Sequence, residues 1–176
     1  GPAWNSWGGH GTSNVRHQTD SGIRAANLKK LKLKWAFALP GSTSSPPTLA
    51  ADRVFVPSIG GVVYSLDART GCTHWAIDVG APARTPIAIG SAGDRLAAFF
   101  GDNKGRVRAV DANTGRELWN THVEAHPMTR LTGAPMLFEG RVYVPVSSFE
   151  ESPDPKYRCC TFRGSLVALD AASGQV

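Results

Sequence analysis

The sequence has no apolar run long enough to cross a bilayer and no charged start followed by a hydrophobic segment. It therefore predicts neither a transmembrane segment nor a secretory signal, and the missing signal leaves the compartment open. Long stretches with a 3.6-residue period are also missing, which argues against helices alternating with a parallel sheet. No basic run is interleaved with stacking aromatic residues, so no nucleic-acid partner is expected despite a net charge of +5.

Glycine and proline, in contrast, are plentiful, at 19 and 12 of 176 residues. They imply many turns and favour an all-β fold. With 41% hydrophobic and 19% charged residues, the composition is that of a folded globular protein. Cysteine is scarce, yet two of the three cysteines, Cys159 and Cys160, are neighbours.

One phrase occurs three times, in residues 61–75, 105–119 and 164–176. Each copy has a glycine, an alternating apolar strand and Asp-Ala-x-Thr/Ser-Gly, and in the first two copies a tryptophan follows four residues later. The aspartate is expected to accept hydrogen bonds from nearby backbone N–H groups while the glycine takes a positive φ, which closes a hairpin. The tryptophans are expected to wedge against a neighbouring unit, and Trp35 to end an earlier unit in the same way.

A second phrase precedes each copy and consists of a short strand, a turn and a second strand, in residues 46–58, 85–100 and 134–147. Each unit therefore holds four strands in roughly 40 to 45 residues, the period of β-propeller blades. The sequence predicts an all-β fold with about three blades, and hence a single incomplete β-propeller domain over residues 1–176, because a closed propeller needs about four to eight blades. Its expected parts are an N-terminal segment with a closing strand (1–35), two blades (36–75 and 76–119) and a truncated blade (120–176).

The densest basic stretch is residues 28–37, where Leu31, Leu33, Trp35 and Phe37 alternate with lysine and alanine. This period of two predicts a half-buried edge strand with its lysines in solvent. Lysines at such an edge discourage pairing between molecules. A polyanion-binding surface is the alternative interpretation.

The third unit is longer than the others because of an insertion, residues 148–164, between its second and third strands. An insertion confined to one blade is more typical of a functional site than of the architecture. It contains Cys159 and Cys160 together with two adjacent acids, Glu150 and Glu151.

The start of the chain resembles the N-terminal motif of pyrroloquinoline quinone (PQQ)-dependent alcohol dehydrogenases, in which Trp-Gly, Asn-x-Arg and Asn-x-x-x-Leu lead into a tryptophan-bearing strand. The matching residues are Trp7, Gly8, Asn14, Arg16, Asn27, Leu31 and Trp35. The cysteine pair followed by Arg163-Gly164 is similar to the adjacent-cysteine loop of the same family. The phrase YRCCTFRGSLVALDAASGQV is most similar to its polyvinyl-alcohol dehydrogenase branch, and the resemblance covers nearly the whole chain.

This resemblance implies an eight-bladed propeller in the bacterial periplasm, with PQQ and a calcium ion near its axis. It implies the oxidation of alcohols, polyvinyl alcohol or another secondary alcohol among them, and a cytochrome c as electron acceptor. In the family the catalytic aspartate and most calcium ligands lie in later blades, so no catalytic or metal-binding residue is assigned here, and three blades alone are expected to show little activity. The alternative is a non-catalytic scaffold of the outer-membrane assembly type, which carries the same repeats without a cofactor.

The adjacent cysteines of the family form a disulfide that lies against one face of the quinone, with an aromatic residue on the other face. The resemblance therefore implies a disulfide between Cys159 and Cys160. Two reduced, buried thiols are one alternative, and a bridge from one of them to Cys72 is another. Zinc binding is disfavoured, because adjacent ligands suit a tetrahedral site poorly.

Other contacts to the cofactor are expected from cations and acids. PQQ carries three carboxylates, which guanidinium groups bind bidentately. The resemblance makes Arg163 the leading candidate, although it lies nearer the cysteines than the matching arginine of methanol-type members, and Arg130 is the second. At most one of Glu150 and Glu151 is expected to hydrogen-bond the quinone ring system, because neighbours on a strand point in opposite directions; solvated loop acids are the alternative.

Two histidines, His122 and His126, would align as metal ligands on a helix. They follow a strand and precede Pro127, so a loop position or a hydrogen bond between blades is expected instead. The chain has no Cys-x-x-Cys-His haem motif. Any haem acceptor is therefore expected on a separate chain or on a further domain.

Overall fold

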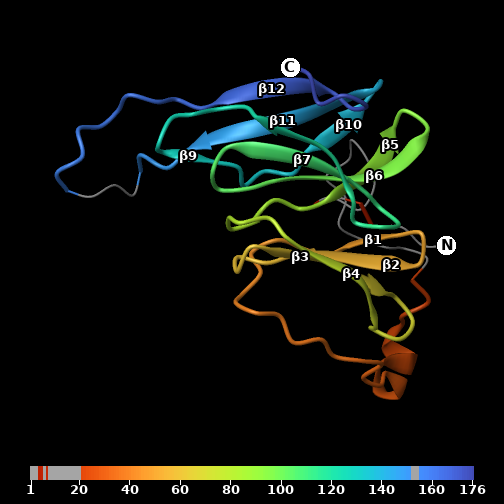
Figure 1. The fold of residues 1–176 in the computed structure, drawn as a ribbon. Helices are drawn as coiled ribbons and strands as arrows, with labels where there is room; N and C mark the ends of the chain where they lie inside the picture. Colours follow the sequence, from red (N-terminus) through yellow and green to blue (C-terminus); the bar gives the residue numbers. More distant parts are fainter. Residues whose placement is uncertain (1–3, 6, 8–20, 152–154) are drawn as a thin grey trace.

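The computed structural model describes residues 4–5, 7, 21–151 and 155–176, which form one 3₁₀ helix and twelve β-strands (Figure 1). The first antiparallel sheet consists of β1 (Thr48–Ala50), β2 (Arg53–Pro57), β3 (Val62–Asp67) and β4 (Thr73–Asp78). The second consists of β5 (Ala88–Ala92), β6 (Arg95–Gly101), β7 (Arg106–Asp111) and β8 (Glu117–His122). The third consists of β10 (Met136–Phe138), β11 (Arg141–Ser148) and β12 (Ser165–Asp170), with β9 (Thr129–Arg130) paired to the end of β11. The all-β prediction is confirmed.

The three sheets are stacked as layers, with the second between the other two (Figure 1). The first strands of the sheets come together, since β5 contacts both β1 and β10. Where β5 meets β10, the end of the Leu137 side chain lies against Gly90, so a Cβ at this position would have to displace it. Blades that meet at their first strands are the expected arrangement around a propeller axis.

The second sheet is buried on both faces because successive strand residues point in opposite directions. Phe99 of β6 lies in the apolar cluster shared with the third sheet, and Phe100 lies in the cluster shared with the first sheet. Both side chains are fully buried. The two clusters hold the three layers together by apolar burial.

The Asp-Ala-x-Thr-Gly turn has the predicted hydrogen bonds. Oδ1 of Asp67 accepts hydrogen bonds from the backbone N–H groups of Arg69 and Thr70 and from the Thr70 hydroxyl group. The bonds from Thr70 hold the pKa of Asp67 below its ordinary value. Gly71 completes the turn with a φ of 77°. The same bonds recur in the turns that begin at Asp111 and Asp170.

The tryptophans dock onto these turns as predicted. The ring of Trp35 covers Gly71, and its Nε1 donates a hydrogen bond to the Ala68 carbonyl oxygen at 3.1 Å. The equivalent pairs are Trp75 with Gly115 and the Ala112 carbonyl oxygen (3.0 Å), and Trp119 with Gly174 and the Ala171 carbonyl oxygen (2.9 Å). Each unit is thus locked to the next by one indole ring.

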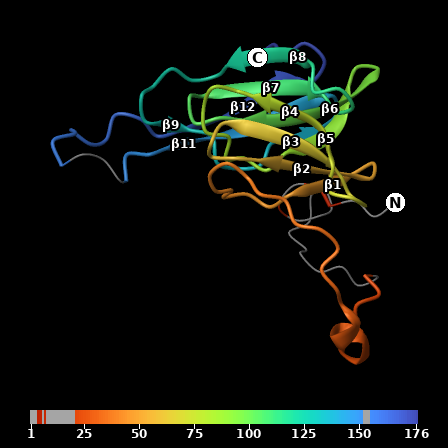
Figure 2. The ribbon, with the colours of Figure 1, turned by 60° about the horizontal axis from the view of Figure 1, so that its bottom comes forward.

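The predicted strand over residues 28–37 is wrong. The closing strand expected within 1–35 stays a prediction, since most of residues 1–20 lie outside the described residues, although Trp4 forms an antiparallel bridge with Leu49 of β1. Residues Ala25–Lys30 form the 3₁₀ helix η1, which stands away from the sheets (Figure 2), and no strand follows it before β1. Leu33 is 85% exposed. A strand needs a hydrogen-bonded neighbour, and within the described part of the chain no strand pairs with this segment. Among the described residues, no helix is both long and apolar enough to span a membrane.

Candidate functional site

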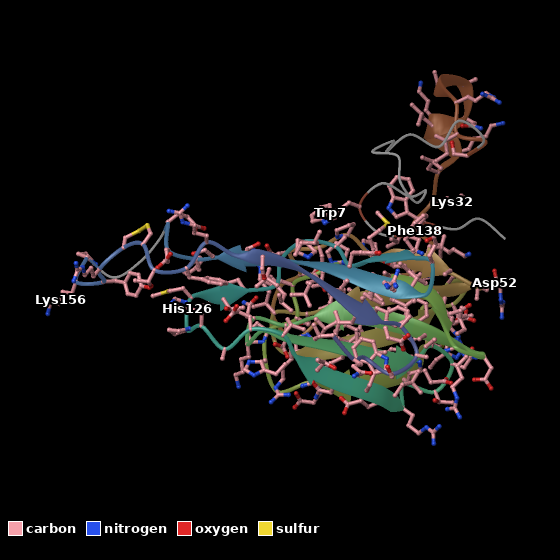
Figure 3. The ribbon with its side chains drawn as sticks, turned by 90° about the horizontal axis from the view of Figure 1, so that it is seen from above. Trp7, Lys32, Asp52, His126, Phe138 and Lys156 are labelled. Carbon is pink, nitrogen blue, oxygen red and sulfur yellow. A yellow bond between two sulfur atoms is a disulfide. The ribbon has the colours of Figure 1, made fainter. Side chains whose placement is uncertain are left out.

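The insertion forms a loop that leaves the third sheet at the end of β11 and returns at β12, as the sequence predicts. Cys159 and Cys160 lie on it, are joined by a disulfide and are exposed. The peptide bond between them is cis. Cys72 is a free, exposed thiol, so both alternatives, reduced neighbouring thiols and a bridge to Cys72, are wrong. Figure 3 shows the disulfide on the projecting loop, at the same end of the molecule as His126.

The base of the loop is organised by the side chain of Glu150, which is only 4% exposed. Its Oε1 accepts hydrogen bonds from the Tyr157 hydroxyl group (2.7 Å), the Thr161 backbone N–H (2.7 Å) and the Thr161 hydroxyl group (3.0 Å). Its Oε2 accepts hydrogen bonds from the Phe162 backbone N–H (3.0 Å) and the Ser148 hydroxyl group (3.2 Å). Both carboxylate oxygens therefore have all their acceptor capacity in use.

These hydrogen bonds fix the charge state of Glu150. Burial alone would raise its pKa, but the bonds from the Thr161 backbone, the Tyr157 hydroxyl group and the Phe162 backbone outweigh burial and lower the pKa to about 2. The hydrogen bond to Thr161 lowers the pKa of Tyr157, but the hydrogen bond to the Glu150 carboxylate and burial raise it more, so the pKa of Tyr157 lies above its ordinary value. Glu150 is thus an anion that stabilises the neutral phenol.

His126 attaches the loop to the body of the protein. Its ring stacks on Phe162, with 4.7 Å between the ring centroids, and its Nε2 lies 3.2 Å from the Thr161 hydroxyl oxygen. The Met128 backbone N–H donates a hydrogen bond to Nδ1, so Nε2 is the nitrogen that carries the proton toward Thr161. His122 has a separate contact, from Nε2 to the Lys104 carbonyl oxygen at 3.1 Å. The two histidines thus make hydrogen bonds to other loops, as expected.

The candidate cations lie in two different environments. The guanidinium group of Arg130 lies over the ring of Phe149, 5.0 Å from its centroid, and donates hydrogen bonds to the carbonyl oxygens of Pro127 and Thr129. Arg163 is exposed, as is Glu151, and neither makes a side-chain hydrogen bond or ion pair within the described residues. The structure therefore brings Glu150 and the disulfide together, whereas Arg163 and Glu151 are free to meet a ligand.

A pocket of about 440 Å³ lies beside the loop, between the second and third sheets. Arg130 and His126 line it from the third unit, and Lys104 and Asn103 line it from the second. Oδ1 of Asn103 is buried without a hydrogen-bond partner in the described part of the chain. The pocket is thus polar, with more basic than acidic groups.

No metal site is formed by the residues that the structure describes. Among the described residues, the only three metal-ligating side chains whose ligand atoms lie close together are Glu150, Cys159 and Cys160. The two sulfurs are bonded to each other, and the carboxylate is occupied by five donors. Calcium prefers several free oxygen ligands, which this group does not offer.

Tyr157, Thr161 and Phe162, which hold the loop through Glu150, were not among the residues predicted from the sequence. Their residue types carry no motif, because two of the five hydrogen bonds come from backbone N–H groups that any residue supplies. The one available signal was Ser148 two residues before Glu150, a short-range pairing typical of loop starts. Gly8, Asn14 and Arg16 of the N-terminal motif lie outside the described residues.

Three sheets locked by tryptophan, with an exposed disulfide on a single inserted loop, define a propeller of PQQ-type repeats. A protein-family model of this type, PQQ_2, described as outer membrane protein assembly factor BamB, matches residues 20–176. The chain therefore belongs to the PQQ-type repeat family.

Two curated relatives are polyvinylalcohol dehydrogenases. The protein from a Pseudomonas species is 42% identical over 98% of this chain, and that from Sphingopyxis sp. (strain 113P3) is 41% identical over 99%. The chain spans only 28% of the length of each. Among solved structures, the quinohemoprotein alcohol dehydrogenase from Comamonas testosteroni matches 99% of this chain and 26% of its own, with a TM-score of 0.79 and 25% identity.

Proposed function

We propose that the chain is the N-terminal part of a PQQ- and calcium-dependent dehydrogenase that oxidises alcohols, polyvinyl alcohol or another secondary alcohol among them. The observation that carries this proposal is the exposed Cys159–Cys160 disulfide on an insertion present in only one of the three units. A repeat that only builds architecture has no need of such a loop. The 41–42% identity to polyvinylalcohol dehydrogenases supports the same function.

The residues present suit a flat, anionic quinone. Two linked sulfurs form a compact, polarizable surface without hydrogen-bonding groups, which favours contact with an aromatic ring face. Arg163, three residues beyond Cys160, is exposed and offers a guanidinium fork to a carboxylate. Arg130 is a second cation at the same end of the molecule.

Within this function each group has a distinct task. Bound PQQ supplies an acceptor for the two electrons that leave the alcohol carbon, and calcium supplies a Lewis acid. Cys159 and Cys160 support one face of the quinone, and Arg163 and Arg130 orient its carboxylates. Of the adjacent acids, Glu151 is available to hydrogen-bond the ring system, while the oxygens of Glu150 are committed to the loop. The family resemblance implies that the proton acceptor and most calcium ligands lie in later blades, so no residue of this chain is assigned to either task.

The proposed compartment is the bacterial periplasm, with a cytochrome c as electron acceptor. An exposed disulfide persists in an oxidising compartment and is reduced in the cytosol. The cytochrome c is what the family resemblance implies, and the absence of a haem-binding motif agrees with an acceptor on another chain or domain.

The test is dye reduction by the full-length protein. After loading with PQQ and Ca²⁺, it is expected to show quinone absorbance and to reduce an artificial electron acceptor when polyvinyl alcohol or a small secondary alcohol is added. Protein given only PQQ or only Ca²⁺ after chelator treatment is the control and is expected to be inactive. Loss of both signals in the loaded protein would contradict the proposal.

A second candidate function is a non-catalytic scaffold of the outer-membrane assembly type. It is favoured by the description of the matching family model. Under this hypothesis the full-length protein binds no quinone and instead captures a partner protein. The disulfide-bearing insertion, found in one of the three units, counts against it, because a repeat that only builds architecture has no need of such a loop.

A further inference from the structure

We propose that Glu150 is a positioning residue: its side chain fixes the loop that carries the Cys159–Cys160 disulfide, and so sets the place and angle at which the quinone rests. The inference relies on the proposed function and assigns to Glu150 an action through the loop rather than a contact with the cofactor. Its neighbour Glu151 has the opposite character, exposed and without partners in the described part of the chain.

Hydrogen-bond donors from both sides of the disulfide converge on this one carboxylate. Ser148 and Tyr157 precede the two cysteines, and Thr161 and Phe162 follow them directly. The backbone N–H groups of the two residues after Cys160 both end on Glu150, so the chain cannot rotate there without breaking them. On the other side, the Sγ of Cys159 lies 4.0 Å from the Glu150 carbonyl oxygen.

All five groups are donors, so the site demands an anion with two acceptor oxygens. A glutamine at this position has one oxygen and an NH₂ group, and the NH₂ group would face donors on one side. The conservative replacement Glu150→Gln is therefore expected to break the loop's attachment even though it preserves shape and volume. This sensitivity to a single atom separates an anchoring carboxylate from a side chain that merely fills space.

A second attachment joins the same cluster to the neighbouring loop. His126 stacks on Phe162 and reaches the hydroxyl group of Thr161, which in turn donates to Glu150. The segment that ends in the disulfide is thus held by a chain of contacts that runs from the loop after β8 to Glu150. The exposed sulfurs have a rigid base although they project from the sheets (Figure 3).

The experiment compares three glutamate-to-glutamine variants of the full-length protein. Glu150→Gln is expected to weaken PQQ binding to the cofactor-free protein by at least about tenfold, as the loss of charge-assisted hydrogen bonds predicts. It is also expected to accelerate hydrogen exchange in the peptide spanning residues 157–163. Glu151→Gln, which removes the exposed carboxylate proposed to hydrogen-bond the quinone, is expected to weaken binding without changing this exchange. Glu139→Gln, at an exposed turn between β10 and β11, is expected to change neither.

Wild-type affinity together with wild-type exchange in Glu150→Gln would overturn the proposal. If that variant does not fold, Thr161→Val tests the same cluster by removing one donor: faster exchange in residues 157–163 supports the anchor, and unchanged exchange overturns it. A wild-type protein that binds no PQQ would overturn the proposed function itself. In that case, faster hydrogen exchange in cofactor-free Glu150→Gln would still show that Glu150 holds the loop, and unchanged exchange would show that it does not. The failure of the proposed function can therefore be told apart from the failure of the role assigned to Glu150.

Discussion

The indole ring of Trp75 lies against Gly115 of the next sheet so closely that a Cβ there would come within 2.9 Å of the ring. At the same place the Nε1 of Trp75 donates a hydrogen bond to the Ala112 carbonyl oxygen at 3.0 Å. Gly115 also has a φ of 74°, which side-chain-bearing residues rarely adopt. Gly115 thus meets two requirements: it takes the positive φ of the turn, and its lack of a Cβ lets the indole ring pack directly against the backbone. The match explains why glycine and tryptophan recur together in the repeat.

Replacing Gly115 by alanine should therefore lower the free energy of unfolding by more than the backbone strain of the turn alone would. Gly80 offers a matched control, because its φ is 69° and a Cβ there would meet nothing within 4 Å. Gly80→Ala is expected to lose about 1 kcal/mol from backbone strain, and Gly115→Ala about 2–4 kcal/mol, because the ring must also move. The midpoints of thermal unfolding of the two full-length variants check this. Equal losses would show that the ring contact contributes nothing.

The repeat could be predicted from the sequence because its structure is local and occurs three times. The bonds within the turn at Asp67 span only three residues, and the spacing from glycine to tryptophan fixes which turn each ring reaches. The strand predicted over residues 28–37 was wrong for the opposite reason. Alternation of Leu31 and Leu33 with lysine is compatible with a strand, but a strand also needs a partner, and the pattern contains no information about one.

The role of Glu150 could not be predicted, since its donors lie up to 12 residues away along an irregular loop. The expectation that Glu150 and Glu151 point in opposite directions assumed a strand, but β11 ends at Ser148 and both acids lie in a turn. The sequence also did not indicate which of the two is buried. That choice is made where β11 ends: Ser147 and Ser148 pair with β9, and the Phe149 N–H bonds to the Met128 carbonyl oxygen. This pairing turns Glu150 inward.

The disulfide gives a direct chemical prediction. In unreduced protein, the peptide that contains Cys159 and Cys160 should be lighter by two hydrogen atoms than its reduced form, whereas Cys72 should react with an alkylating reagent. Cys160→Ser is expected to leave the loop attached through Glu150 but to weaken PQQ binding, because the linked sulfurs are lost. Cys72→Ser, which changes an exposed thiol between β3 and β4, should bind PQQ as the wild type does. Peptide mass spectrometry and PQQ titration measure the two effects.

Substitutions of Arg163 test whether PQQ binding needs only a positive charge at this position or also the two parallel hydrogen bonds of a guanidinium group. Arg163→Ala is expected to weaken PQQ binding about 10- to 100-fold, the range for a lost charge-assisted hydrogen bond, and Arg163→Lys to restore part of it. The planar guanidinium group binds a carboxylate with two parallel hydrogen bonds, which an ammonium group cannot reproduce. Arg69→Ala, at an exposed turn of the first sheet, is the control. Equal affinity of Arg163→Ala and wild type would remove Arg163 from the site.

The low pKa of Glu150 makes the attachment of the loop depend on pH in a defined window. The group titrates at an ordinary value of 4.5 in the unfolded chain and at about 2 in the folded protein, so the unfolded chain takes up the proton first as the pH falls. Its contribution to stability is therefore complete above about pH 4.5, declines below it and is lost near pH 2. The turn aspartates Asp67, Asp111 and Asp170, whose pKa values are also lowered, act in the same direction and obscure the effect in wild type alone.

The difference in thermal midpoint between wild type and Glu150→Gln isolates this contribution, because both proteins share the turn aspartates. It is expected to be constant from pH 7 to pH 5 and to shrink toward pH 2, where a protonated carboxyl group is as poor an acceptor for five donors as an amide. The same comparison with Glu139→Gln supplies the reference for an exposed acid. A difference that stays constant down to pH 2 would mean that the carboxylate is not held by the charge-assisted bonds seen at the base of the loop.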